Sequence, residues 1–395
     1  MKRAMKWMVS ALLALIVLGW WFSRAAKPDA FYDAPANVPA APGALLRQEL
    51  FERYVPANAR GWRILYTTTR SDGSPALGSA IVLAPKAPTS EPRPVLAWTH
   101  GTAGIATGCA PSMLDLDPVT YMPAWNLAPS QGWILVAPDY AGLGTAGPHE
   151  YVIGPGEARS TLDAMRAARH IDGVVASDRN VVWGHSQGGH AALWTGILAP
   201  DYAPDVRIAG VGGVAPATDL PAIVEAIQGS LEGRILTALA LQAYANVYPD
   251  VVVDDYVRSL AAPLARDMAS RCMTPGSMVF SAFEALATGG SIFKLSPSSG
   301  AFGQRLKQNV PDQPITMPLM IAQGAADDVV SAGIQAAFVQ RRCAAGQSMT
   351  YVRYAGRDHM GVVAPDSAFS QDLLQWTRDR FAGVPAPGGC QVLER

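Results

Sequence analysis

The stretch from Val181 to Trp194, VVWGHSQGGHAALW, places a serine where it could act as a nucleophile. A serine hydroxyl attacks a carbonyl carbon when a base removes its proton and its oxygen faces the substrate. Gly184 and Gly188 flank Ser186 in the pattern G-x-S-x-G, which lets a strand turn sharply into a helix with the serine at the tip. A buried strand leads in and a helix leads out, so we expect Ser186 to be the nucleophile. The plainer alternative is a small residue in an ordinary strand-to-helix turn.

Six histidines are candidates for the base that takes the serine proton. His185 and His190 lie too close to Ser186 in sequence for their rings to turn back readily to its hydroxyl. His359 lies in the loop YAGRDHMG, directly after the last predicted strand, and open α/β proteins bind ligands at that edge of the sheet. We therefore expect His359 to be the base, with His149 as the reserve.

A histidine base needs a carboxylate that fixes its tautomer and stabilises its positive charge. The stretch MIAQGAADDVV offers two neighbours, Asp327 and Asp328, in the loop after another predicted strand. Asp327 is preferred because the chain is still turning there, three residues past Gly324, whereas Asp328 is expected to help start the next helix. The resulting chain order of serine, aspartate and histidine is the order found in α/β hydrolases.

The negative oxygen formed by serine attack must be held by hydrogen-bond donors that are already in place. One predicted donor is the backbone N–H of Gln187, at the start of the helix after the nucleophile. The other is expected in the loop HGTAG, where Gly101 and Gly104 allow close backbone approach, and Thr102 is the preferred residue. The alternative for this loop is a turn whose small residues serve packing alone.

The composition excludes several classes of protein. The 395 residues are 49% hydrophobic and carry 31 basic and 32 acidic side chains. Because the positive and negative charges nearly cancel, the composition does not indicate electrostatic binding of nucleic acid. Four cysteines form an even set without a CxxC pair or histidines at zinc-ligand spacing, so we expect two disulfides and no metal. The residues alone leave three pairings of these cysteines open.

Alternating strands and helices predict an α/β fold with a mainly parallel central sheet flanked by helices. Nearly continuous apolar runs are typical of strands buried on both faces, and they occur at 94–100, 132–140, 180–185, 208–216, 318–324 and 349–356. Helices are expected over 156–170 and from 188 to Pro200. A hairpin is expected around the turn Ser71 to Pro75.

The N-terminal residues are interpreted as a targeting segment over 1–26, followed by an Ala/Pro-rich extended linker over 27–43. Three basic residues precede the apolar run from Trp7 to Phe22. Cleavage near Ser23 to Ala25 is preferred, and an uncleaved membrane anchor through 7–22 is the alternative. In both cases the catalytic part lies outside the cytoplasm, so we expect a secreted or periplasmic protein.

One region interrupts the alternation of strands and helices. Residues 219–311 contain several helical pieces and no confident strand, and we interpret them as a mostly helical cap inserted before the aspartate. The hydrolase core would then comprise 44–218 and 312–395. The alternative is a set of extra helices with no role at the site.

Five motifs occur together in the order expected of an α/β hydrolase: HGTAG, APDYAGLG with the following GPHEY, GHSQGGHAAL, QGAADD and RDHMG. In combination they resemble the secretory lipase family, the fungal lipase A group with its bacterial relatives, from about Trp62 to the end of the chain. The resemblance implies esters of fatty or other apolar acids as substrates, contact with a lipid interface, a cap that shapes the acyl pocket, and no cofactor. It also implies the disulfide pairs Cys109 with Cys272 and Cys343 with Cys390.

The sequence therefore predicts a secreted serine carboxylic-ester hydrolase, either a triacylglycerol lipase or a carboxylesterase. Its partner is a small-molecule or lipid ester, with no nucleic acid. An exported serine peptidase or an acyltransferase with the same three residues is the nearest alternative. A non-catalytic binding protein on the same scaffold is the alternative from another class.

Overall fold

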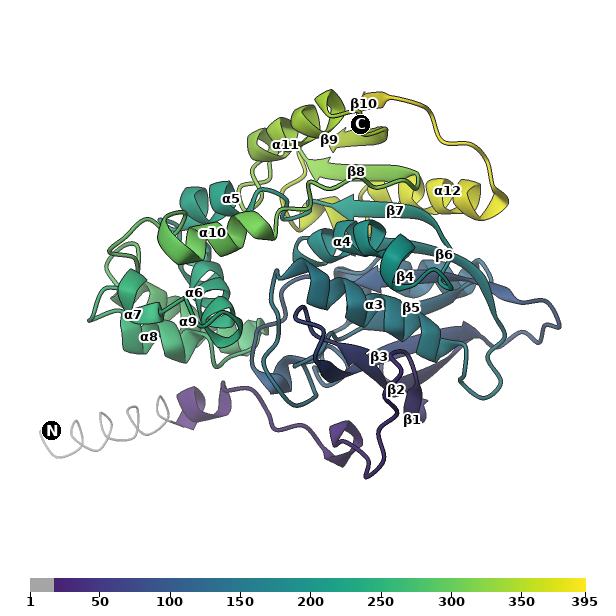
Figure 1. Cartoon of the computed structure of the whole chain (residues 1–395), viewed down its shortest axis with the longest axis horizontal. Helices are drawn as coiled ribbons and strands as arrows, with labels where there is room; N and C mark the ends of the chain where they lie inside the picture. The colour runs from purple at the N-terminus through teal and green to yellow at the C-terminus, as the bar shows by residue number, and fades with distance from the viewer. Residues whose placement is uncertain (1–17) are drawn as a thin grey trace, which may run out of the picture.

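A central sheet of ten strands organises the computed structural model, which describes residues 18–395 (Figure 1). The strands are β1 (Leu45–Phe51), β2 (Ala59–Thr69), β3 (Pro75–Pro85), β4 (Arg93–Thr99), β5 (Ile134–Pro138), β6 (Ala176–His185), β7 (Ile208–Val214), β8 (Leu319–Gly324), β9 (Met349–Tyr354) and β10 (Cys390–Glu394). Their order is β1-β2-β3-β5-β4-β6-β7-β8-β9-β10, and all pairs from β5 to β10 are parallel. The predicted α/β class with a mainly parallel sheet is confirmed.

Helices cover both faces of this sheet, which explains the continuous apolar runs in its strands. The sheet-covering helices are α2 (Ala124–Ser130), α3 (Gly154–Ala168), α4 (Gln187–Tyr202), α11 (Ala332–Ala344) and α12 (Phe369–Ala382). Leu162, Trp194 and Phe338, from α3, α4 and α11, share one hydrophobic core with the sheet. Trp125 of α2 and Phe369 of α12 belong to the core on the opposite face.

Most predicted elements are present, and the differences lie at the edges. The hairpin around Ser71 to Pro75 is the antiparallel pair β2–β3. Strands β1 and β10 were not predicted: β10 exposes most of its side chains, and β1 carries no fully buried residue before Phe51. Helix α4 continues through Pro200 to Tyr202 rather than ending at the proline.

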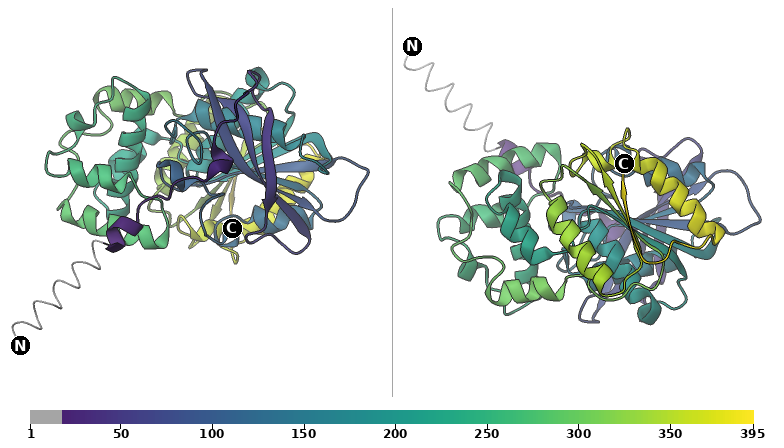
Figure 2. Two further views of the ribbon diagram at one scale, coloured as in Figure 1. Left: turned by 90° about the horizontal axis from the view of Figure 1, so that it is seen from below. Right: turned by 90° about the horizontal axis from the view of Figure 1, so that it is seen from above.

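Between β7 and β8 the chain forms helices that leave the sheet. They are α5 (Leu220–Ile227), α6 (Leu231–Val247), α7 (Val253–Tyr256), α8 (Ala262–Met268), α9 (Pro275–Ala287) and α10 (Gly300–Gln308). Most of one hydrophobic core lies among them and includes Leu239, Tyr244 and Phe302, and residues 151–153 before α3 also belong to it. Figure 2 shows these helices as a separate green layer beside the strands. We call residues 219–309, which contain the six helices and the loops between them, the insertion.

The segment predicted as an extended linker is partly packed on the sheet. Phe31 and Tyr32 are buried against Leu65 of β2, and the Arg63 guanidinium lies 4.2 Å from the centre of the Phe31 ring. Burial of these two aromatic side chains therefore holds part of the 27–43 segment against the sheet. The free energy gained by their burial outweighs the preference of the prolines for an extended, unpacked chain.

The predicted targeting segment lies mostly outside the described residues, since 1–17 are not among them. Its end packs on the insertion: the Ser23 side chain accepts a hydrogen bond from Arg271 at 2.8 Å, and Ser277 donates to the Ser23 carbonyl at 2.7 Å. Trp20 donates to Asp267 at 2.8 Å. Within residues 18–395 no helix is long and apolar enough to span a bilayer.

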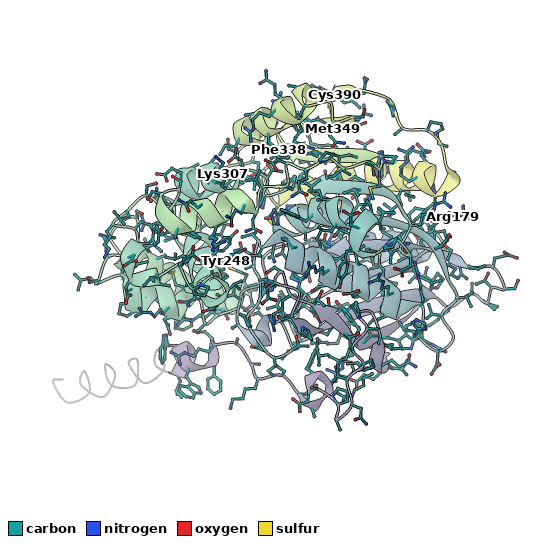
Figure 3. All side chains as sticks on the ribbon, viewed as in Figure 1. Arg179, Tyr248, Lys307, Phe338, Met349 and Cys390 are labelled. Carbon is teal, nitrogen blue, oxygen red and sulfur yellow. A yellow bond between two sulfur atoms is a disulfide. The ribbon has the colours of Figure 1, made fainter. Side chains whose placement is uncertain are left out.

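Two disulfides join distant parts of the chain, with the pairing that the family resemblance implies. Cys109, in the loop after β4, is bonded to Cys272 between α8 and α9. Cys343, in α11, is bonded to Cys390 at the start of β10. Cys390 is also the register partner of Met349 on β9, and both are labelled in Figure 3. The second disulfide thus fastens the C-terminal edge strand to the helix beside it.

Candidate active site

Ser186 occupies a strained turn between β6 and α4. Its φ of 59° and ψ of −120° are unusual for a residue with a side chain, and such strain persists where the surrounding structure enforces it. The backbone N–H of Ser186 donates to the Val214 carbonyl at 2.9 Å, which ties the turn to the end of β7. The turn presents the serine side chain at the carboxyl end of the parallel strands.

The two glycines of the motif are required by close packing around this turn. A Cβ atom added at Gly184 would overlap the Thr99 hydroxyl, and one added at Gly188 would overlap the Thr99 carbonyl oxygen. Both positions face the last residue of β4 and have no space for a side chain. The motif G-x-S-x-G therefore needs its two glycines because β4 packs directly against the turn.

The three residues expected to act together lie within hydrogen-bond distance of one another. His359 Nε2 is 2.9 Å from the Ser186 hydroxyl oxygen, and His359 Nδ1 is 2.8 Å from Asp327 Oδ2. A proton on Nδ1 that is donated to Asp327 leaves Nε2 free to accept the serine proton. This arrangement suits general-base activation of a serine.

Asp327 is held rigidly in the loop after β8. Its Oδ1 accepts from the backbone N–H groups of Val329 and Val330 at 3.0 and 2.8 Å, and its Oδ2 also accepts from Gln323 at 2.9 Å. Its neighbour Asp328 is exposed. The expectation that Asp328 starts the next helix is wrong: Ser331 caps α11, with its side chain accepting from Gly333.

The other histidines near the serine have different partners. His149, the reserve base, lies 3.4 Å from the Ala141 carbonyl and 3.1 Å from the Gln187 side chain, and it is not paired with Ser186. His185 Nε2 is 2.8 Å from the His359 carbonyl oxygen. Burial lowers the pKa of both His149 and His185 to about 3, so both rings are neutral near pH 7.

The backbone groups expected to hold a negative oxygen border the same cavity as Ser186. Gln187 is the first residue of α4, and N–H groups in the first turn of a helix have no acceptor within that helix. Thr102 also lines the cavity, in the loop after β4, and its hydroxyl is 2.8 Å from that of Tyr151. The Met273 N–H donates to the Ala103 carbonyl at 2.9 Å, so this loop is tied to the insertion.

A cavity of about 430 Å³ opens from Ser186 between the sheet edge and the insertion. Its walls are mainly apolar, and helices α5 and α6 contribute Ile223, Val224, Leu236 and Ala240. Glu232, exposed at the start of α6, also borders it. The cavity suits a substrate with an apolar chain attached to the reacting carbonyl.

The structure adds polar residues that were not predicted from the sequence. Glu157, in the first turn of α3, is fully buried and hydrogen-bonded to the side chain of Gln187 at 2.6 Å. Two of its partners, Gln187 and His190, lie thirty or more positions away, so no local pattern reveals these contacts. Among residues 18–395 there is no group of three or more His, Cys, Asp or Glu side chains that could hold a metal ion.

Comparisons with known proteins bear on the family and the fold of the chain. Residues 122–389 match the family model described as Secretory lipase. Lipase 6 of Candida albicans is 24% identical over 421 residues, covering 98% of this chain and 88% of that protein. A probable inactive lipase of Mycobacterium tuberculosis is 28% identical, covering 90% of this chain and 82% of that protein. The structure of Candida antarctica lipase A in its closed state superimposes with a TM-score of 0.75 at 20% identity, covering 92% and 87% of the two chains.

We predict that Gly188→Ala prevents the turn at Ser186 from forming. The added methyl group would meet the backbone of β4, which cannot move without disturbing the sheet, so the free energy of unfolding should fall by about 3 kcal/mol. The matched control is Gly276→Ala in α9, where an added Cβ meets nothing within 4 Å. Thermal unfolding of both variants tests this, and equal midpoints would contradict the packing argument.

Proposed function

Because the chain belongs to the secretory lipase family and is a secreted ester hydrolase with the α/β-hydrolase fold, we propose that it acts through a covalent acyl-enzyme formed on Ser186. The observation that carries this proposal is the hydrogen-bonded series from Ser186 through His359 to Asp327 at the mouth of an apolar cavity. The substrate class is an ester of an apolar acid, as in a glyceride or a simple carboxylic ester.

In the proposed first half-reaction the Ser186 oxygen attacks the ester carbonyl carbon while His359 Nε2 takes the hydroxyl proton. Asp327 accepts from Nδ1 and stabilises the resulting imidazolium. The carbonyl oxygen becomes negative and is held by the backbone N–H groups of Gln187 and Thr102. The tetrahedral intermediate then expels the alcohol, which takes its proton from His359.

In the second half-reaction water replaces the alcohol. His359 takes a proton from the water, whose oxygen attacks the acyl carbon, and a second tetrahedral intermediate forms at the same donors. Its collapse breaks the bond to Ser186 and returns the proton to the serine oxygen. The products are a carboxylic acid and an alcohol, and no cofactor takes part.

Helices α5 to α10 are proposed to act as the cap of this site, with α5 and α6 bordering the acyl chain. Apolar side chains of α5, α6 and α10 line the cavity beside Ser186, which supports a direct role for the insertion in substrate choice. This assignment makes the core of the enzyme 44–218 together with 312–395, and the cap 219–311.

The peptidase alternative is supported by one observation. Glu232 is an acidic side chain of α6 that borders the cavity, and a carboxylate there could bind the ammonium group of a peptide substrate. Aminoacyl nitroanilides tested beside nitrophenyl esters separate the two functions. Faster turnover of the anilides, lost in Glu232→Gln, would favour the peptidase.

We predict that Ser186→Ala lowers kcat on nitrophenyl esters by about 10⁶-fold, because no other group supplies the nucleophile. Asp327→Asn should lower kcat by about 10⁴-fold through loss of the correct histidine tautomer. Asp328→Asn is the matched control and should retain wild-type kcat, since this neighbouring carboxylate is exposed. Full turnover by Ser186→Ala, or an equal loss in both aspartate variants, would overturn these assignments.

The apolar cavity predicts that kcat/KM rises with acyl length from acetyl to octanoyl nitrophenyl esters. Each added methylene that leaves water contributes up to about 0.8 kcal/mol. Leu236→Trp should move the optimum to shorter chains, because the larger ring fills the cavity. The control is Leu231→Trp, an exposed position on the same helix that does not line the cavity. A flat series in the wild-type protein would exclude the cavity as the acyl site.

Secretion follows from the family, and the contacts of residues 20–25 support a more specific proposal about the N-terminus of the exported protein. Ser23 is buried and hydrogen-bonded to α9 and to the buried Arg271, and Arg24 pairs with Asp267 at 2.8 Å. We expect these residues to remain in the exported protein, which differs from the cleavage near Ser23 to Ala25 preferred from the sequence. Intact-mass measurement tests this, and a mature chain that starts at Ala26 would contradict it.

A further inference from the structure

Glu157 lies directly behind the residue that follows the nucleophile, yet it does not line the cavity. Its Oε1 accepts from the Gln187 side-chain amide at 2.6 Å and from the Val152 N–H at 3.0 Å. Its Oε2 lies 3.3 Å from His190 Nδ1. The carboxylate is fully buried and all its partners belong to this protein, so it is built into the structure behind the site.

The Gln187 side chain has a second partner that fixes its orientation. Its amide nitrogen is also 3.1 Å from His149 Nε2, and His149 Nδ1 faces the Ala141 carbonyl. Because burial keeps His149 neutral, a proton on Nδ1 leaves Nε2 as an acceptor. Both N–H groups of the Gln187 amide therefore point to acceptors, one on α3 and one in the loop before it.

His190 is a further partner of the Glu157 carboxylate. Its Nδ1 lies 3.3 Å from Oε2, and its Nε2 is 2.7 Å from the Asn309 carbonyl oxygen. The ring is fully buried, so it adds a fixed contact from α4 to the carboxylate.

We propose that Glu157 is a positioning residue that holds Gln187, and with it the N–H that binds the oxyanion, in the orientation needed for catalysis. The proposal rests on the function assigned to Ser186 above. The strained turn at Ser186 places Gln187 at the start of α4, and the Glu157 carboxylate and His149 fix its side chain from behind. Loss of this support lets the first turn of α4 relax, and the oxyanion donor moves with it.

The same network reaches the insertion. The Asn309 carbonyl accepts from both His190 and Trp194 of α4, at 2.7 and 3.0 Å, and the Asn309 side chain accepts from the Gly154 N–H at 3.0 Å. Asn309 also donates to the hydroxyl of Tyr248, labelled in Figure 3 beside α10. Glu157 thus connects the oxyanion donor to the end of the insertion through His190.

The test is Glu157→Ala, with Glu150→Ala as the matched control. Glu150 is also buried and hydrogen-bonded, but its partner is Ser71 and it has no contact with Gln187. We expect Glu157→Ala to lower kcat on nitrophenyl butyrate by about 10- to 100-fold with KM within about twofold, because a small misplacement of the oxyanion donor acts on the transition state.

A second measurement is the binding of a trifluoromethyl ketone, whose hemiketal oxygen would occupy the proposed oxyanion site. Its affinity should weaken by the same factor as kcat/KM. Glu150→Ala should lose stability but retain kcat.

Glu157→Gln provides the conservative rescue. A glutamine oxygen can accept from Gln187 and Val152, and its amide nitrogen can donate to Nδ1 of a neutral His190, which still donates to Asn309. Every hydrogen bond is kept, so kcat should stay within about threefold of the wild-type value. A purely structural role would lower the melting temperature of Glu157→Ala without changing kcat or ketone binding below the transition.

The outcomes separate this proposal from the proposed function. No ester turnover by the wild-type protein, or turnover independent of Ser186, overturns the function itself. Normal wild-type turnover with unchanged kcat in folded Glu157→Ala overturns the positioning role. If Glu157→Ala does not fold, Gln187→Leu tests the positioning role instead, because it keeps the backbone N–H but removes the side-chain amide that Glu157 binds. Unchanged kcat in Gln187→Leu overturns the proposal, and a loss of kcat supports it.

Discussion

The strained turn at Ser186 is the constraint on which the rest of the site depends. Holding a non-glycine residue at this φ costs on the order of 1–3 kcal/mol, and the surroundings must supply that free energy. The end of β7 fixes the incoming strand, and β4 packs so closely against Gly184 and Gly188 that no side chain fits there. The exposure of the proposed nucleophile therefore depends on the sheet, through the parallel strands on either side of β6.

The insertion is joined to the core at places that border the site. The disulfide between Cys109 and Cys272 and the hydrogen bond from Met273 to Ala103 tie one part of it to the loop after β4. Asn309, at its other end, is held by His190 and Trp194 of the helix that starts at the nucleophile. These two attachments connect the walls of the cavity beside Ser186 to the segments that carry the predicted oxyanion donors.

The sequence allowed the prediction of those features that follow from local pattern and chain order. Ser186, Asp327 and His359, which the structure brings within hydrogen-bond distance, could be proposed from the sequence because each follows a strand that is visible as an apolar run. The edge strand β10 was missed because most of its side chains face solvent and leave no apolar pattern. Glu157 was missed for a different reason: α3 is buried on nearly all sides, so no polar stripe distinguishes its first turn. Two of its partners, Gln187 and His190, come from the distant helix α4.

Burial controls the charge of two groups behind the predicted oxyanion donors. His149 and His185 are neutral near pH 7 because burial lowers their pKa. Glu157 is fully buried as well, and its carboxylate is held by the Gln187 side chain, the Val152 N–H and His190. In the low dielectric of the interior, a carboxylate without such partners would raise the energy of a negative oxygen several ångströms away. The proposed role of the backbone dipoles at the start of α4, to stabilise a developing oxyanion, therefore depends on how well this buried carboxylate is hydrogen-bonded.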